Sequence, residues 1–312
     1  MREFYPDYYQ DFHCLADQCH HSCCIGWEIG VDADTLAFYE GLLQSDAPLS
    51  AELKNKLASS LCRGEEGVTF SLCEGDRCPF LQQDGLCELI CHLGEGALCQ
   101  ICSDHPRFYH FFCDRKETGI GLCCEEAARL ILLQKTPMTL LEEEGSEEEE
   151  FFDEQERQED EAIIALRDQM FSLIEETEDW QTCENGLLSL VSAQNTPFAP
   201  EEYARFLKDL ERLDPAWDDL LARSAFEMGK ETLQQPVRRL LTYFLFRHLP
   251  DARYDGKLAE RVCFAVFSAK FLLALSKEDD MEDFCNLARA FSAEIEYSDE
   301  NLSAVLSYFS AD

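Results

Sequence analysis

Positively charged residues are scarce in this sequence. It contains 26 lysines and arginines against 63 aspartates and glutamates, which gives a net charge of −37. Proteins that bind nucleic acid need a basic surface to neutralise the phosphates, so DNA and RNA are excluded as main partners. A basic partner, such as a lysine-bearing protein surface, would be attracted to this chain. Solubility alone would also explain the charge.

Long apolar runs are missing as well. No stretch approaches the ~18 apolar residues that a membrane-spanning helix needs. The first residues, MREFYPDYYQDFHC, lack the basic start and the apolar stretch of a secretory signal. We therefore expect a cytoplasmic protein with no membrane partner, in a compartment where structural disulfides are rare.

Several enzyme motifs are also absent. The chain contains no G-x-x-x-x-G-K-[ST], H-E-x-x-H or G-x-S-x-G sequence. The close glycine pair Gly94–Gly96 follows an expected helix instead of a strand, which does not suit a dinucleotide-binding turn. The C-x3-C-x2-C pattern of radical S-adenosylmethionine enzymes is absent too, so no donor site can be assigned from motifs.

Cysteine, by contrast, is abundant. Fourteen of the 17 cysteines lie between Cys14 and Cys124, beginning with the pattern C-x4-C-x3-C-C. Cysteines at this density form disulfides or bind metal, and the expected compartment favours metal. The C-x2-C pair Cys99–Cys102 places two thiolates on one turn, which suits zinc or one edge of an iron–sulfur cluster. The spacing leaves both metals open.

The remaining cysteines and the histidines have weaker patterns. Five cysteines in the same region are interpreted as buried or spare thiols: Cys62, Cys73, Cys91, Cys113 and Cys123. Three others fall singly in helical patterns and are expected in a core: Cys183, Cys263 and Cys285. His20, His21 and His105 adjoin the cysteine clusters and are secondary ligand candidates.

The sequence predicts a mainly α fold in three parts. Residues 1–140 are expected to form a cysteine-rich metal-binding module with a few short strands, and residues 162–312 an all-α helical module. Between them, residues 141–161 hold 13 acidic residues and one basic residue, which predicts a linker. Within it we expect a loop over Glu142–Asp153 and a helix that begins between Glu154 and Asp160.

Periodicity, capping residues and turn residues give the expected elements. In the first part they are short strands at Trp27–Asp32 and Val68–Leu72, helices at Ala33–Gln44, Ser50–Leu61 and Cys124–Gln134, and a turn at Asp84–Gly85. In the last part they are helices at 162–176, 183–192, 200–213, 215–228, 235–248, 257–276, 281–294 and 301–309. The stretch VRRLLTYFLFRHL is apolar on most sides, which predicts a central buried helix.

Several segments carry a resemblance to a known family. YPDYYQDFHCLADQCHHSCCIGWEIGVD, CPFLQQDGLCELICHLGEGALCQICSDHPRF, LCCEEAARLIL and LLTYFLFRHLPDARYDGKLAERVCFAVFSA resemble the flagellin lysine N-methylase family. The family's cysteines match nine positions here: Cys14, Cys19, Cys23, Cys24, Cys78, Cys87, Cys99, Cys102 and Cys124. One departure is Cys123-Cys124-Glu125-Glu126, where the family usually reads Ser-Cys-Pro-Glu.

The resemblance implies transfer of methyl groups from S-adenosylmethionine to surface lysines of flagellin or another lysine-rich protein. It also implies that the nine cysteines are the ligand candidates for an iron–sulfur cluster, [4Fe–4S] in type, with zinc as the alternative metal. It identifies no catalytic residue and no residue that binds the methyl donor. A second hypothesis is a non-catalytic iron- or zinc-binding carrier, redox or adaptor protein, and a third has zinc in a purely structural role.

Overall fold

The computed structural model describes residues 1–45, 49–65, 67–143, 145, 153–193, 198–223, 234–276 and 280–310. The chain forms two compact units. His13–Pro106 form one, called here the cysteine-rich unit, because it contains 11 of the 17 cysteines. Met1–Phe12 and Arg107–Asp312 form the other, called the helical unit.

The cysteine-rich unit consists of short elements joined by turns. They are η2 (Ala16–Gln18), α1 (Ala33–Gln44), α2 (Ala51–Ser60), β2 (Leu61–Arg63), β3 (Val68–Phe70), α3 (Glu88–Leu93), η3 (Glu95–Ala97) and α4 (Gln100–Asp104). The predicted α1 and α2 are confirmed, and Ser50 caps α2 by accepting the Leu53 N–H at 3.1 Å. The turn at Asp84–Gly85 is also present, with Gly85 at φ +86°.

The strand expected over Trp27–Asp32 does not form. Only Gly30 makes a bridge, to Thr69, while Val31 donates to the carbonyl of Val68 at 2.7 Å. Because β3 is three residues long and pairs on its other side with β2, it offers too short an edge for a full strand. The segment still contributes the buried side chains of Ile29 and Val31 to the core.

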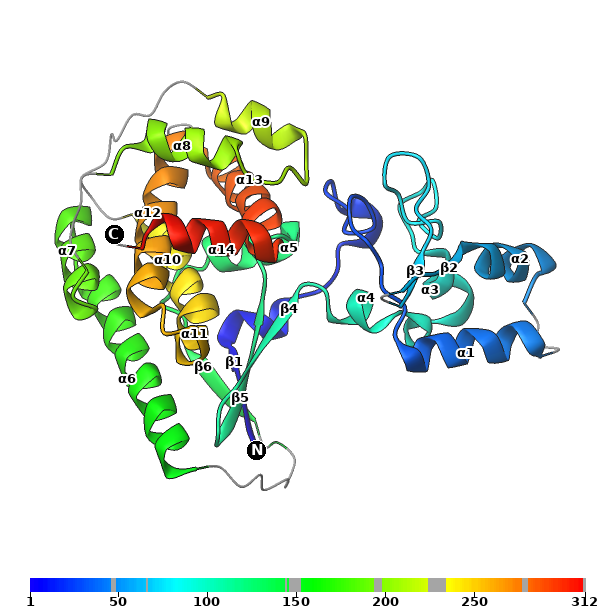
Figure 1. Cartoon of the computed structure of the whole chain (residues 1–312), viewed down its shortest axis with the longest axis horizontal. Coiled ribbons are helices and arrows are strands. Elements are labelled where there is room, and N and C mark those ends of the chain that lie inside the picture. Colours follow the sequence, from blue (N-terminus) through cyan, green and yellow to red (C-terminus); the bar gives the residue numbers. More distant parts are fainter. Residues whose placement is uncertain are drawn as a thin grey trace. The chain divides into compact units, whose positions relative to one another are not determined.

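The helical unit contains a four-stranded sheet that the sequence did not reveal. Its strand order is β4-β5-β1-β6, for Arg107–Phe111, Arg115–Ile120, Arg2–Pro6 and Leu140–Glu143. β1 pairs in parallel with β5 and antiparallel with β6. In Figure 1 the blue N-terminal strand therefore lies beside strands that follow the cysteine-rich unit in sequence.

The other elements in the described part of this unit are helices, as predicted for residues 162–312. They are η1 (Asp7–Asp11), α5 (Glu125–Leu132), α6 (Glu154–Glu176), α7 (Trp180–Leu190), α8 (Pro200–Lys208), α9 (Ala216–Leu221), α10 (Gln235–His248), η4 (Leu249–Asp251), α11 (Ala252–Asp255), α12 (Leu258–Leu275), α13 (Met281–Phe291), the π-helical turn η5 (Ser292–Glu296) and α14 (Asp299–Tyr308). The mainly α fold class is confirmed. The prediction of a central buried helix is correct for α10, which packs against α5, α6 and α12.

The boundaries of the compact units differ from the three-part division expected from composition. α5 packs on α10 and α13, so residues just before position 140 share the core of the C-terminal helices. The acidic segment is only partly loop: Glu142 and Glu143 lie in β6, and residues 144 and 146–152 lie outside the described residues. α6 begins at Glu154 as expected, with Asp153 as its N-cap.

Candidate metal centre

All 17 cysteines are thiols, without disulfide bonds. The nine ligand candidates are divided between the two units. Eight of them, from Cys14 to Cys102, belong to the cysteine-rich unit, whereas Cys124 is the N-cap of α5 in the helical unit. The candidates therefore do not all belong to one compact part of the chain.

Five thiols gather in the core of the cysteine-rich unit. Cys78 and Cys99 are buried in it, and three partly buried cysteines, Cys24, Cys87 and Cys102, pack against it. We call these five residues the thiol cluster. Their charges interact. The charges of Cys24, Cys78 and Cys99 raise the pKa of Cys102, and the charge of Cys24 raises the pKa of Cys87.

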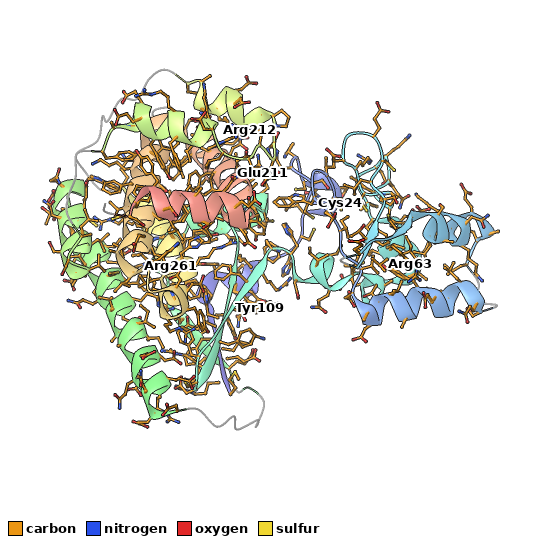
Figure 2. All side chains as sticks on the ribbon, in the orientation of Figure 1. Cys24, Arg63, Tyr109, Glu211, Arg212 and Arg261 are labelled. Atoms are coloured by element: carbon orange, nitrogen blue, oxygen red, sulfur yellow. The ribbon has the colours of Figure 1, made fainter. Side chains whose placement is uncertain are left out.

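Backbone bonds bring the first three of these thiols together. The Cys78 N–H donates to the carbonyl of Cys24 at 2.8 Å, which joins positions 54 residues apart in the sequence. The turn at Asp84–Gly85 then returns the chain, so that Leu81 forms a bridge with Cys87. Cys24, one of the residues labelled in Figure 2, lies on the loop between η2 and α1.

Asp32 fixes the C-x2-C segment. Its carboxylate accepts the Gln100 N–H at 2.8 Å and the Thr35 N–H at 2.9 Å, so one side chain caps both α4 and α1. The bond from Gln100, followed by those from Thr35, lowers the pKa of Asp32 to about 2. The cap holds Cys99 and Cys102 on their shared turn, where the Cys102 N–H bonds the Cys99 carbonyl at 2.9 Å.

Tyr39 places a hydroxyl against the same turn. The buried hydroxyl donates to the carbonyl of Ala97 at 2.6 Å and lies 3.8 Å from the Cys99 sulfur. No local pattern indicated a site role for Tyr39, because an aromatic residue on a helix is usually a packing residue. Asp32 could have been identified as a helix cap, but its second bond to α4 depends on the tertiary fold.

The thiols of the cluster differ in acidity. A hydrogen bond with Cys23 is the largest cause that lowers the pKa of Cys24 to about 7, and the Arg77 guanidinium acts in the same direction. The interaction between the Cys99 and Cys102 thiols is the largest cause of both shifts, and it lowers the pKa of Cys99 and raises that of Cys102.

Burial is the largest cause of the pKa shifts at the remaining two thiols of the cluster. It raises the pKa of Cys78 to about 11 and raises the pKa of Cys87 as well. Ionising several of these thiols together therefore requires a compensating cation, and this donor set suits a thiophilic metal.

The described part of the chain brings no three ligands around a single point. Within the residues that the structure describes, no group of three or more His, Cys, Asp or Glu side chains is placed to hold one ion. A structural zinc site needs four ligands, with thiolates ~2.3 Å from the metal. An iron–sulfur cluster binds each thiolate to a different iron, so its ligands lie further apart.

The other sequence candidates lie outside the thiol cluster. Cys14 and Cys23 are exposed, and Cys19 is partly exposed. Cys14 accepts the Ala16 N–H at 3.4 Å, and His105 is the C-cap of α4. The structure does not group His20, His21 or His105 with thiols as a metal site.

The thiols expected to be spare or buried have different environments. Three in the cysteine-rich unit are exposed: Cys62, Cys73 and Cys91. Cys113 is partly buried, and Cys123 is buried beside Tyr297 and Arg247. The core role predicted for Cys183, Cys263 and Cys285 is confirmed, since all three pack in the core of the helical unit.

A second group of ionisable side chains is buried in the helical unit. The Glu296 carboxylate, carried by the π-helical turn, accepts from Tyr243 at 3.1 Å and lies 2.5 Å from His248 Nε2. Tyr243 in turn accepts from Arg247 at 2.8 Å and from the Leu122 N–H at 3.1 Å. The bonds join α10, the π-helical turn and the segment before α5, which gives this network a structural role.

Fold and site together define a two-unit protein whose cysteine-rich unit gathers thiols in its core. No family model and no solved structure matches the chain. The flagellar biosynthetic protein FliU of Salmonella muenchen is 29% identical over 131 residues, which cover 41% of this chain and 75% of that protein.

Two further relatives are named for an activity. The lysine-N-methylases of Salmonella choleraesuis and Salmonella typhimurium are each 28% identical over 131 residues, again 41% of this chain but 31% of each methylase. These likenesses confirm the resemblance to the flagellin lysine N-methylases over that part of the chain. In the described part of the chain no helix combines the length and apolar character needed to cross a membrane.

Proposed function

We propose that this chain is a cytoplasmic protein lysine N-methyltransferase that uses S-adenosylmethionine and acts on surface lysines of flagellin. The observation that carries the proposal is the likeness to two proteins named lysine-N-methylase. The likeness to a flagellar biosynthetic protein supports flagellin as the substrate. Because the matched segment is a third or less of each methylase, the activity of the whole protein stands as a proposal.

We also propose an iron–sulfur cluster, [4Fe–4S] in type, as the resident cofactor. Its ligands would come from the thiol cluster, since four thiolates hold such a group and five are gathered there. When bound, the group would supply electron transfer or a rigid cross-link between the loop of Cys24 and the turn of Cys99. Tyr39 would orient the Cys99 sulfur, and Asp32 would hold α4 in place.

Methyl transfer requires a neutral amine on the target lysine. An unperturbed lysine has a pKa of ~10.4, so it is almost entirely protonated near neutral pH. Carboxylates that attract the ammonium also favour its charged form, whereas desolvation favours the neutral amine. The acidic chain is therefore suited to recruiting lysines, and deprotonation has to occur where the amine is shielded from water.

The first experiment measures metal, sulfide and methyl transfer together. Protein purified without oxygen is analysed for iron, acid-labile sulfide and zinc, and then incubated with S-adenosylmethionine and flagellin. Iron with stoichiometric sulfide and methyl-lysine in flagellin are the expected results. Cluster-loaded protein that moves no methyl group to flagellin would refute the enzyme and leave the metal-binding carrier or adaptor, while zinc without sulfide would refute the iron–sulfur cofactor.

Serine variants test the assignment of ligands. Cys99→Ser and Cys102→Ser should lose most of the bound iron, because each removes a thiolate from the thiol cluster. Cys62→Ser is the matched control, since Cys62 is an exposed thiol of β2 in the same unit and lies outside the cluster. Equal iron in all three variants would contradict the assignment.

A further inference from the structure

One cationic side chain of the cysteine-rich unit lies among the ligand candidates. The unit contains four lysines and arginines, which are Lys54, Lys56, Arg63 and Arg77. Arg77 directly precedes Cys78 and is partly buried, whereas the side chain of Arg63 is 62% exposed. Because charged side chains are usually solvated, a guanidinium that is drawn into the fold indicates specific hydrogen-bond partners there.

The guanidinium of Arg77 binds the backbone of the segment that leads to Cys87. Its Nη2 atom donates to the carbonyls of Leu81 and Gln82, at 3.1 and 2.6 Å. Leu81 in turn forms an antiparallel bridge with Cys87. We call residues 78–87, which include this bridge, the cysteine hairpin. The side chain of Arg77 therefore holds the first arm of the cysteine hairpin, and the bridge joins the second arm to the first.

The main chain of Arg77 joins the loop that carries Cys24. Arg77 forms an antiparallel bridge with Ile25, the residue after Cys24. The next residue, Cys78, donates its N–H to the carbonyl of Cys24 at 2.8 Å. Arg77 therefore binds this loop with its main chain and the cysteine hairpin with its side chain. The segments that carry Cys24, Cys78 and Cys87 are linked through this one residue.

The C-x2-C turn has a different anchor. Cys99 and Cys102 are held by Asp32, whose carboxylate caps both α4 and α1. The thiol cluster therefore consists of two groups, three thiols linked through Arg77 and two thiols held by Asp32. Each anchor is an ionised side chain that bonds main-chain groups, and such charge-assisted hydrogen bonds are stronger than those between neutral groups.

We propose that Arg77 is a positioning residue of the thiol cluster. It holds Cys24, Cys78 and Cys87 in place for the metal. The inference rests on the proposed function and its metal cofactor, and it adds how the chain presents three of the ligands. Residues that orient metal ligands strengthen metal binding without touching the metal. Because Arg77 already joins the two segments, less ordering is left to occur when the metal binds, and the metal is bound more tightly.

The test uses the full chain as purified, in three variants. Arg77→Met removes the hydrogen-bond donor, and Arg77→Lys keeps the charge on a shorter side chain. Arg63→Met is the matched control, because Arg63, labelled on β2 in Figure 2, forms an exposed ion pair with Glu40, and such pairs contribute little to stability. Amide hydrogen exchange is measured by mass spectrometry, and the rate at which bound metal passes to a chelator is followed separately.

The expected result is a local change. In Arg77→Met, amide exchange over the cysteine hairpin should be roughly tenfold faster, as for loss of a hydrogen bond from a charged donor, while exchange over residues 99–105 should stay at the wild-type rate. Bound metal should be released roughly tenfold faster, which is the effect of losing a residue that orients ligands. Arg77→Lys should change both rates by a smaller factor, because its ammonium donates from a shorter side chain. Arg63→Met should behave as wild type.

Other outcomes would overturn the positioning role. Wild-type exchange over the cysteine hairpin in Arg77→Met would do so, even with faster metal release, because that combination would mean that only the charge of Arg77 matters. Equal acceleration over the cysteine hairpin and residues 99–105 would mean general support of the fold. Faster exchange with unchanged metal release would mean that the order of the hairpin does not affect the metal. If Arg77→Met does not fold, the same comparisons are made with Arg77→Lys.

The two proposals can fail separately. Wild-type protein that holds neither iron nor zinc refutes the proposed cofactor, and the exchange rates still decide whether Arg77 orders the cysteine hairpin. Wild-type protein that holds metal, together with Arg77 variants that exchange amides and release metal at wild-type rates, refutes the positioning role and leaves the proposed cofactor intact. Neither decision depends on methyl transfer.

Discussion

The ion pair between Glu117 and Arg167 permits a quantitative test of how the sheet is attached to the helices. Glu117 of β5 and Arg167 of α6 form two hydrogen bonds of 2.5 and 2.8 Å, and their side chains are 0% and 1% exposed. Removing one partner from such a pair leaves an uncompensated charge in the core, at a cost of about 3–5 kcal/mol.

The structure predicts that the two single variants differ. In Arg167→Met the Glu117 carboxylate keeps Arg115, whose Nε lies 3.6 Å away, so the loss should be near 3 kcal/mol, the lower end of that roughly 3–5 kcal/mol range. In Glu117→Met the buried Arg167 guanidinium keeps the rings of Phe171 and Phe246, which is weaker compensation for a desolvated cation. Its loss should approach about 5 kcal/mol. The double variant should return to within about 1 kcal/mol of wild type, because it removes both charges of the buried pair.

The assay is thermal and urea unfolding followed by circular dichroism and tryptophan fluorescence. For a unit of 150–250 residues, 1 kcal/mol shifts the Tm by roughly 2–4 °C, so Arg167→Met should melt roughly 6–12 °C below wild type. A double variant as unstable as Glu117→Met would contradict this prediction. Such a result would show that packing volume, and not a stranded charge, determines the loss.

Three further outcomes follow from single side chains. Asp32→Ala should destabilise the cysteine-rich unit by about 1–2 kcal/mol and increase amide hydrogen exchange at the start of both α1 and α4. An increase in exchange at α1 alone would contradict the double cap. Tyr39→Phe should lower the stability of the unit by about 1–3 kcal/mol, because the buried carbonyl of Ala97 loses its hydrogen-bond donor. The rate of Cys99 alkylation in metal-free protein should also change. An unchanged rate would mean that the hydroxyl does not act on the sulfur. Burial and neighbouring arginines lower the pKa of His110 from 6.5 to about 3, so the unfolded state binds the proton first and stability is lost as the pH falls from about 6.5 toward 3. His110→Phe should remove a slope of up to ~1.4 kcal/mol per pH unit in that window, measured by urea unfolding at a series of pH values, and an unchanged slope would contradict the assignment.

Local signals in the sequence predicted the helices well. The Ser50 cap located the start of α2, acidic residues located the start of α6, and proline at the first turn located α8. Their ends were less accurate, since α8 stops at Lys208 instead of residue 213. The sheet was missed because β1 pairs with β5, more than 100 residues away, and its alternation over five residues is interrupted by charge. Long-range pairing, not propensity, makes this segment a strand.

The candidate site could likewise be predicted from the sequence only in part. Spacing identified the C-x2-C pair and the dense cysteine region, but it could not say which thiols meet. Cys23 and Cys24 are adjacent in sequence, yet Cys24 is partly buried and packs against the core, while Cys23 is exposed. Cys24 reaches Cys78 through one backbone hydrogen bond that no local pattern encodes. The partition of the cysteines is therefore a property of the fold.

Thiols in a core normally weaken the case for a ligand role, because a buried cysteine is often only a small apolar residue. Cys183 and Cys263 fit that description, since each lies singly among apolar side chains. The thiol cluster does not, because five sulfurs act on one another and two of them have lowered pKa values while others are raised by burial. A core made only for packing would be served by isolated neutral thiols, whereas a metal cofactor would hold neighbouring sulfurs as thiolates in metal–sulfur bonds. The cysteine-rich unit has a small apolar core, so those bonds would also contribute to its folding.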